Sequence, residues 1–284
     1  MSIINELKYK MLHSGSRLYM FIGINILIFL VINLLAVFQF LFTRSTTYAD
    51  WLELNLSMPS YLPALATKFW TVLTYMFSHR GFFHIFFNMI WLYWMGRIFE
   101  DFLNKRQFTF TYLAGGVAGA VLYIISYYVF PAFSDSVQHS VIIGASASVM
   151  AIVVATATLL PDYTIMLLLF GSVRLKYLAI AFIILDLIML TGTNAGGSIS
   201  HIGGAILGYV YIKQLRKGND WSKLFVRKRT KLRPIRNESM PRRTINELPD
   251  QEVIDSILDK ISKSGYDSLS KTEKEQLFKA SKKQ

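Results

Sequence analysis

The stretch Gly144-Ala145-Ser146-Ala147-Ser148-Val149-Met150 carries the strongest clue to this chain, because it places a hydroxyl between small residues at the start of a long apolar run. Small residues and hydroxyls also line ordinary contacts between membrane helices, so a lone Gly-x-Ser is a weak signal. His201 strengthens it: this residue opens another apolar helix, and Gly204 and Gly208 follow on the same face. We therefore place the candidate functional centre at Ser146 and treat the other polar residues as its partners.

The composition of the 284 residues indicates a polytopic membrane protein. Hydrophobic residues make up 53% and aromatic residues 14%, and the mean hydropathy is +0.38, which is too apolar for a soluble domain of this size. The chain has no cysteine, so disulfides, thiolate metal sites and a cysteine nucleophile are excluded. The net charge of +12 would suggest nucleic acid in a soluble protein, but the basic residues fall mainly beside the membrane. We interpret them as topology signals and expect no nucleic-acid partner.

Six apolar runs predict an all-α membrane protein with six transmembrane helices. They cover about residues 18–42, 82–99, 108–130, 145–160, 177–190 and 199–212. The predicted membrane domain is 18–215, preceded by an N-terminal segment, 1–17. Its long first loop, 43–81, is polar and aromatic, as in a folded interfacial segment. The stretch 163–176 is apolar but interrupted by glycine and basic residues, which predicts a short interfacial hairpin.

The distribution of Lys and Arg between the loops predicts the orientation. The termini and the segments 100–107 and 171–176 are basic, whereas the loops 131–140 and 191–198 have no basic residue. Only the long first loop, 43–81, departs from this distribution, and basic residues in long loops have less influence on orientation. We therefore expect both termini in the cytoplasm. As a separate expectation, we place the chain in the bacterial inner (plasma) membrane.

This topology brings polar residues to one membrane depth. The second, fourth and sixth spans all start at the outer face, and their first turns carry His84 and Asn88, Ser146, and His201. Polar residues inside a membrane are costly and usually face a partner or a water-filled cavity, so a shared depth predicts a shared cavity. A lone His or Asn in a span can equally be a satisfied structural group, so the prediction of a cavity depends on the shared depth.

A serine and a histidine in one cavity favour nucleophilic chemistry. The Ser146 hydroxyl needs a base within hydrogen-bond reach, and His201 is the natural candidate. Acyl transfer also needs donors for the oxyanion, which Asn88, His84 and the backbone N–H of Ser146 could supply. No convincing zinc-ligand spacing occurs, so we expect no metal site and no cofactor.

Five motifs occur in order between Trp70 and Tyr211. They are Trp70-Thr71-Val72-Leu73-Thr74-Tyr75-Met76-Phe77, His84-x-x-x-Asn88, Gly96-Arg97 with Glu100, Gly-x-Ser at 144–146, and His201-x-x-Gly204-x-x-x-Gly208. Together they resemble the rhomboid intramembrane serine proteases. The resemblance implies a six-helix core, a Ser–His dyad without a carboxylate, and cleavage of other membrane proteins in or beside their transmembrane segments. Carried over by position, Ser146 is the expected nucleophile, His201 the general base, and His84 and Asn88 the oxyanion donors.

The chain departs from the family pattern at three places. Ala147 follows the nucleophile where the family usually has Gly, Trp70-Thr71 replaces a Trp-Arg pair, and Met150 stands where some members have a Tyr that packs on the base. None of these changes removes a catalytic group, so we expect an active enzyme with altered packing. The alternative is an inactive rhomboid-like scaffold that binds transmembrane segments.

Three further features receive structural interpretations. Asp186 is a carboxylate well inside a predicted span, but an aspartic intramembrane protease needs two such acids, so a structural or capping role is favoured over a functional one. His79 falls in a predicted loop, where a solvated side chain is usual. The segment 192–198 contains three glycines and is predicted to form a mobile cap above His201.

Beyond the core, the sequence predicts a basic linker and a small helical cytoplasmic tail. Residues 216–248 are rich in Lys and Arg beside the last span, which favours attraction to an anionic cytoplasmic leaflet. Within the tail, 249–284, apolar residues at helical spacing predict one helix, and Gly265 is a plausible stop. Ser270-Lys271-Thr272-Glu273 predicts a capping box for a second helix. The expected partners are transmembrane substrates and the lipid bilayer, and the sequence leaves the oligomeric state open.

Overall fold

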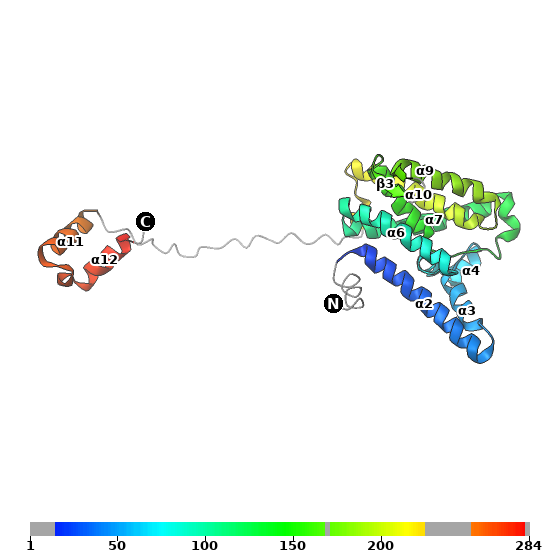
Figure 1. Ribbon diagram of the computed structural model, residues 1–284, viewed down its shortest axis with the longest axis horizontal. Coiled ribbons are helices and arrows are strands. Elements are labelled where there is room, and N and C mark those ends of the chain that lie inside the picture. The colour runs from blue at the N-terminus through cyan, green and yellow to red at the C-terminus, as the bar shows by residue number, and fades with distance from the viewer. Residues whose placement is uncertain (1–14, 168–170, 225–250, 282–284) are drawn as a thin grey trace. The chain divides into compact units, whose positions relative to one another are not determined.

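The computed structural model describes residues 15–167, 171–224 and 251–281 (Figure 1). The chain divides into two compact units, Met1–Arg227 and Lys228–Gln284. Most of the predicted N-terminal segment and of the predicted basic linker lies outside the described residues.

The first unit is built from long helices that correspond to the six predicted spans. They are α2 (Arg17–Thr43), α6 (Phe82–Phe102), α7 (Lys105–Val129), α8 (Ser146–Leu159), α9 (Leu175–Ile188) and α10 (Ala195–Arg216). Among the described residues, α2 and α7 are long and apolar enough to cross a membrane by length and composition, and α8 is a shorter apolar helix. Short 3-10 helices follow three of them, after α7, α9 and α10: η2 (Pro131–Ser136), η3 (Met189–Thr191) and η4 (Trp221–Lys223).

The predicted interfacial loop, 43–81, is folded. It contains α3 (Thr47–Leu56), β1 (Met58–Pro59), α4 (Leu62–Thr67), α5 (Thr71–Thr74) and η1 (Tyr75–Phe77). β1 pairs with β2 (Val141–Ile142) in antiparallel register. The N–H of Gly144 also donates a hydrogen bond to the carbonyl oxygen of Tyr75, at 2.9 Å. The loop therefore holds the segment that leads into α8.

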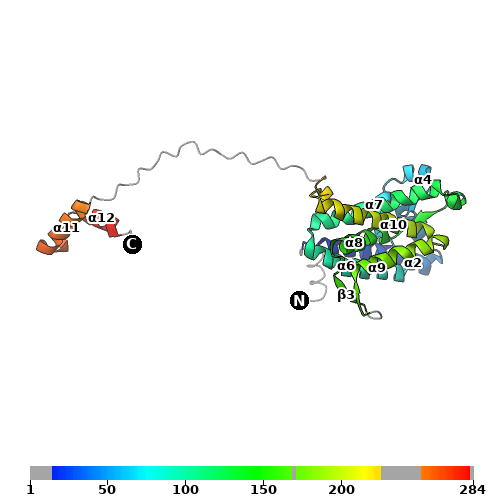
Figure 2. The same cartoon turned by 90° about the horizontal axis from the view of Figure 1, so that it is seen from above.

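Helix α8 lies in the middle of the bundle (Figure 2), and its residues from Ala147 to Ala157 are all buried. It packs against α6, α7, α9 and α10. Glycines permit the close contact with α10, because a methyl group at Gly204 would overlap the carbonyl oxygen of Ala147, and one at Gly208 that of Ala151. Small residues on both helices therefore let α8 and α10 approach closely.

Charged residues in the last turn of α6 and the first turn of α7 connect the helices at this end of the unit. Glu100 Oε1 accepts hydrogen bonds from the N–H groups of Arg17 and Leu18, at 2.8 and 3.1 Å. A carboxylate is favourable there because the N-terminus of a helix such as α2 carries partial positive charge. Arg106, in the first turn of α7, donates to Asp220 Oδ2 at 2.9 Å and so links α7 to the segment after α10.

The predicted hairpin at 163–176 is confirmed as β3 (Thr164–Leu167) paired antiparallel with β4 (Gly171–Arg174). Asp162 precedes it and accepts a hydrogen bond from Lys176 at 2.7 Å. This bond holds the pKa of the Asp162 carboxyl below its ordinary value. The pair closes the base of the hairpin where α9 begins.

The second unit, as described, consists of α11 (Gln251–Ser264), η5 (Tyr266–Ser268) and α12 (Lys271–Ser281). Gly265 ends α11 with φ 80°, a backbone angle that favours glycine. The predicted capping box is confirmed: Ser270 N–H donates to Glu273 Oε2 at 2.7 Å, and Glu273 N–H donates to Ser270 Oγ at 3.3 Å. The hydrogen bond from Lys260, with those from Ser270, lowers the pKa of Glu273 to about 2.

Candidate active site

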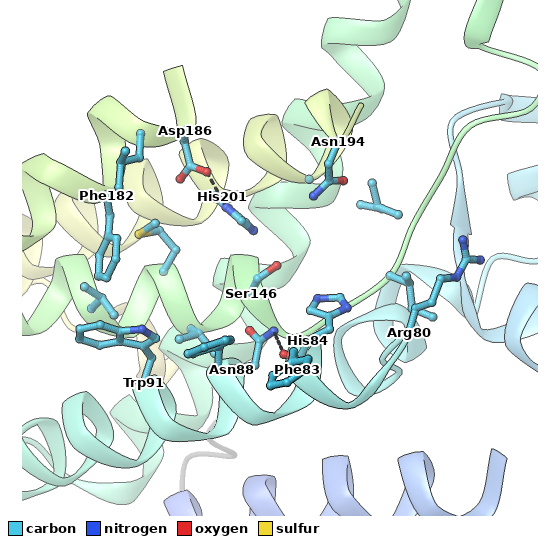
Figure 3. Close-up of a pocket in the computed structure, with 18 of the residues that line it drawn as sticks. Arg80, Phe83, His84, Asn88, Trp91, Ser146, Phe182, Asp186, Asn194 and His201 are labelled. Atoms are coloured by element: carbon cyan, nitrogen blue, oxygen red, sulfur yellow. Dashed lines mark hydrogen bonds and ion pairs between the residues drawn. The ribbon is translucent and has the colours of Figure 1, made fainter. Parts of the chain in front are cut away.

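A cavity of about 760 Å³ is lined by residues of α6, α8, α9 and α10 (Figure 3). The four residues singled out from the sequence, His84, Asn88, Ser146 and His201, all lie on its wall. The shared cavity predicted from the topology is therefore present. Much of the remaining wall is apolar and aromatic, with side chains such as Phe83, Phe87, Trp91 and Phe182.

Ser146 is the first residue of α8 and lies between His201 and the His84–Asn88 pair in Figure 3. Its N–H has no partner within the helix, as at every helix start, so it is available to a substrate atom. Gly144 precedes it with φ 126°, a conformation that residues with a side chain rarely adopt. A Cβ atom there would lie 2.6 Å from His84 Nε2, so glycine lets the chain pass beside this imidazole.

His201, in α10, is held by a carboxylate from α9. Its Nδ1 lies 2.7 Å from Oδ1 of Asp186, and the two side chains are 22% and 10% exposed. Within the described residues Asp186 caps no helix. The structural or capping role favoured from the sequence did not include this contact with His201. The resemblance implied a dyad without a carboxylate, whereas here a carboxylate contacts the histidine.

No hydrogen bond joins Ser146 Oγ to His201 Nε2 in the part of the chain that the structure describes. Catalytic hydrogen bonds are often long in unliganded enzymes and tighten when a substrate binds. The two side chains face one cavity from α8 and α10, which approach closely at Ala147 and Gly204. The geometry is therefore compatible with a serine that transfers its proton to the histidine.

Asn88 and His84 share one face of α6, as their spacing predicts. Asn88 Nδ2 donates to the carbonyl oxygen of His84 at 2.8 Å, and the residue is 8% exposed. An amide nitrogen carries two hydrogens, so one donor remains for another acceptor. Both side chains lie on the cavity wall opposite His201 (Figure 3).

The prediction of a solvated side chain for His79 was wrong. His79 is 1% exposed, and its Nε2 accepts a hydrogen bond from the N–H of Ala145 at 3.3 Å. Burial, with a smaller contribution from His84, lowers the pKa of His79 to about 3, so the ring is neutral and can accept. His79 thus fixes the residue that precedes Ser146. Its position before the His84 motif gave no sign of this role.

Part of the segment 192–198, which the sequence predicted as a mobile cap, is helical. Helix α10 begins at Ala195, so Gly196 and Gly197 are helical. A Cβ atom at Gly196 would lie 2.9 Å from the ring of Tyr123 in α7, which shows that this glycine serves close packing. Helix contacts outweighed the local preference of glycine for loops.

The methyl group of Ala147, the residue that departs from the family pattern, is accommodated by α7. A Cβ atom at Gly119 would lie 2.7 Å from Ala147 Cβ, so glycine at 119 provides the space for this methyl group. The contact of Ala147 with α10 is made instead by its carbonyl oxygen, which faces Gly204. Met150 lines the cavity with Ser146. Among the described residues, no group of three His, Asp or Glu could hold a metal ion.

The fold and the cavity define a helical protein with a polar site among its helices. A model of the rhomboid domain matches residues 66–218, and a family of unknown function (DUF6576) matches residues 246–283. The chain therefore belongs to the rhomboid family and is an integral membrane protein.

Two curated relatives share about half of this chain. RHOMBOID-like protein 12, mitochondrial, from Arabidopsis thaliana is 32% identical over 158 residues, covering 52% of this chain and 47% of the relative. Presenilin-associated rhomboid-like protein A, mitochondrial, from Danio rerio is 28% identical over 158 residues, covering 53% and 38%. The chain thus matches less than half the length of either relative.

Proposed function

We propose that this protein is an intramembrane serine endopeptidase that cleaves other membrane proteins in or near their transmembrane segments. The observation that carries the proposal is the single cavity that collects Ser146, His201, Asn88 and His84. It supports a protease because nucleophile, base and oxyanion donors are the groups that acyl transfer needs. The family membership is consistent with this activity.

In the proposed reaction, Ser146 Oγ attacks the carbonyl carbon of the scissile peptide while its proton passes to His201 Nε2. The N–H of Ser146, the side chain of Asn88 and that of His84 stabilise the oxyanion. The C–N bond then breaks, and the proton moves from His201 to the leaving amine. Water attacks the acyl-enzyme, gives its proton to His201 and releases the carboxylic acid, and this proton returns to Ser146.

We also propose that α2, α6, α7, α8, α9 and α10 are six membrane spans with both termini in the cytoplasm. The basic-loop asymmetry supports this orientation. Cysteines placed at Asp135, in η2, and at Asp101, at the end of α6, test it in this cysteine-free chain. A membrane-impermeant maleimide should label the first on intact cells and the second only after permeabilisation, and the reverse pattern would invert the orientation.

The identity of the membrane and the lipid partner are proposed from the sequence alone. We propose the bacterial inner membrane as the location, whereas the two relatives are named as mitochondrial proteins. The basic segment 216–248 is proposed to bind an anionic cytoplasmic leaflet.

The second candidate is an inactive scaffold that binds transmembrane segments, favoured by the missing hydrogen bond between Ser146 and His201. Cleavage of a transmembrane substrate in reconstituted membranes separates the two. Ser146→Ala and His201→Ala should each abolish cleavage. Ser148→Ala is the matched control, because Ser148 is fully buried and absent from the cavity wall. Equal behaviour of wild type and Ser146→Ala would favour the scaffold.

A further inference from the structure

Asp186 and His201 form a hydrogen-bonded pair on the cavity wall. Oδ1 of Asp186 lies 2.7 Å from Nδ1 of His201, and the residues come from α9 and α10. Both side chains are largely shielded from solvent. Figure 3 shows the bond at the end of the imidazole that lies farther from Ser146, so the opposite end of the ring is left for the serine.

An acid at this position is costly for the fold. Helix α9 is otherwise almost wholly apolar, and Asp186 is flanked by Leu185 and Leu187. Charged groups within membrane helices are rare and usually functional. The residue is 7% exposed, and its Oδ2 has no hydrogen-bond partner among the described residues. Its polar interaction is thus directed at one atom, Nδ1 of His201.

The electrostatic surroundings single out Asp186. The other titratable or charged side chains on the cavity wall are His84, in α6, and Arg80, just before it. The residues that α8 contributes to the wall carry no charge, and α10 contributes His201 itself. Asp186 is therefore the one acid on the described wall, and its charge is the local counterpart for a proton gained by His201.

We infer that Asp186 is a positioning residue for His201, so that Ser146, His201 and Asp186 act as a triad. The carboxylate accepts the Nδ1–H, which leaves the imidazole lone pair on Nε2, the atom that takes the serine proton. During acylation the Ser146 proton moves to Nε2, the Nδ1 proton stays on the ring, and Asp186 stays ionised. Its negative charge then stabilises the imidazolium. This inference rests on the proposed function, because it requires His201 to act as a base.

The test compares Asp186→Asn and Asp186→Glu with the wild-type protein in proteoliposomes that contain a transmembrane substrate. The dependence of kcat/KM on pH and the thermal midpoint are measured for each. Asn keeps the size and removes the charge, whereas Glu keeps the charge and displaces it by one methylene. Asp162→Asn, which neutralises an exposed acid before β3, is the matched control.

Asp186→Asn should lower kcat by about 10²–10⁴-fold, because the orientation of His201 and the stabilisation of its protonated form are both lost. The acid limb of the profile should move to lower pH, because the substitution removes a negative charge that favours a proton on the neighbouring imidazole. Asp186→Glu should keep the wild-type acid limb and recover part of the rate. Asp162→Asn should match the wild type.

An Asp186→Asn protein that folds and keeps either the wild-type acid limb or the wild-type rate would overturn the inference. If Asp186 only connected α9 to α10, its substitution would lower the thermal midpoint and the rate but would leave the acid limb of the pH profile in place. If Asp186→Asn does not fold, Asp186→Glu gives the test. This variant keeps the carboxylate, so an acid limb displaced to lower pH in it would also overturn the inference. Cleavage that survives Ser146→Ala would instead refute the protease itself, whatever the Asp186 variants do.

Discussion

Gly204→Ala is the substitution that most sharply tests how the bundle assembles the site. Gly204 lies one helical turn after His201 and faces the backbone of α8, where a methyl group would overlap the carbonyl oxygen of Ala147. The new Cβ atom would also lie 2.9 Å from the carbonyl carbon of Ala147. Because these are backbone atoms, a side-chain rotation cannot relieve the overlap, and α10 must move away from α8.

The expected effects on stability and rate differ in size. Overpacking typically costs about 1–3 kcal/mol, and alanine returns about 1 kcal/mol through its higher helix propensity, so the net loss of stability should be about 0–2 kcal/mol. The loss in cleavage rate should be larger than this loss in stability. A displacement of about 1 Å of His201 relative to Ser146 lowers the rate by about 10²-fold, since proton transfer requires close alignment.

The assay follows cleavage of a transmembrane substrate in proteoliposomes and the unfolding midpoint in detergent. Gly96→Ala is the matched control: its new Cβ atom would contact side-chain atoms of Leu18 and Phe108, which can adjust, and it is remote from the cavity. We expect Gly96→Ala to keep nearly wild-type turnover. Wild-type turnover in Gly204→Ala would refute the idea that the contact between α8 and α10 sets the Ser146–His201 geometry.

Three further outcomes follow from the described contacts. Arg106→Ala should lower the unfolding midpoint by the equivalent of about 1 kcal/mol, because it removes a charged hydrogen bond to the partly buried Asp220, and the Arg106 side chain is itself 39% exposed. Ala147→Gly should cost about 1 kcal/mol in the same assay and retain cleavage, because it deletes only a methyl group that packs at Gly119. Circular dichroism of the isolated 246–283 segment should show helix loss as pH falls from about 4.3 toward 2, because the folded-state pKa of Glu273 is depressed. Glu273→Gln should remove this pH dependence, and an unchanged acid transition would contradict the assignment.

The helices and the cavity could be predicted because each depends on patterns local in the sequence. Apolar runs indicate the helices, and the parity of the spans brings His84, Ser146 and His201 to one depth. The capping box at 270–273 is likewise a local pattern, in which two residues three apart satisfy each other's backbone.

The interactions that the sequence did not reveal depend on how separate elements pack. The bond between Asp186 and His201 requires a particular rotation of α9 against α10, which a span with apolar residues on every face does not specify. The burial of His79 depends on the folded loop that meets the segment before α8. The helical start at Ala195 reflects packing of Gly196 on Tyr123, against the usual preference of glycine.

Labelling with a serine-directed fluorophosphonate tests most directly whether Ser146 is an activated nucleophile. The detergent-solubilised protein is treated with the probe, and the modified peptide is located by mass spectrometry. The probe should attach to Ser146, and His201→Ala should abolish labelling because the hydroxyl then lacks its base. A folded protein that stays unlabelled, or that carries the label on Ser148, would contradict the assignment of a serine protease centred on Ser146.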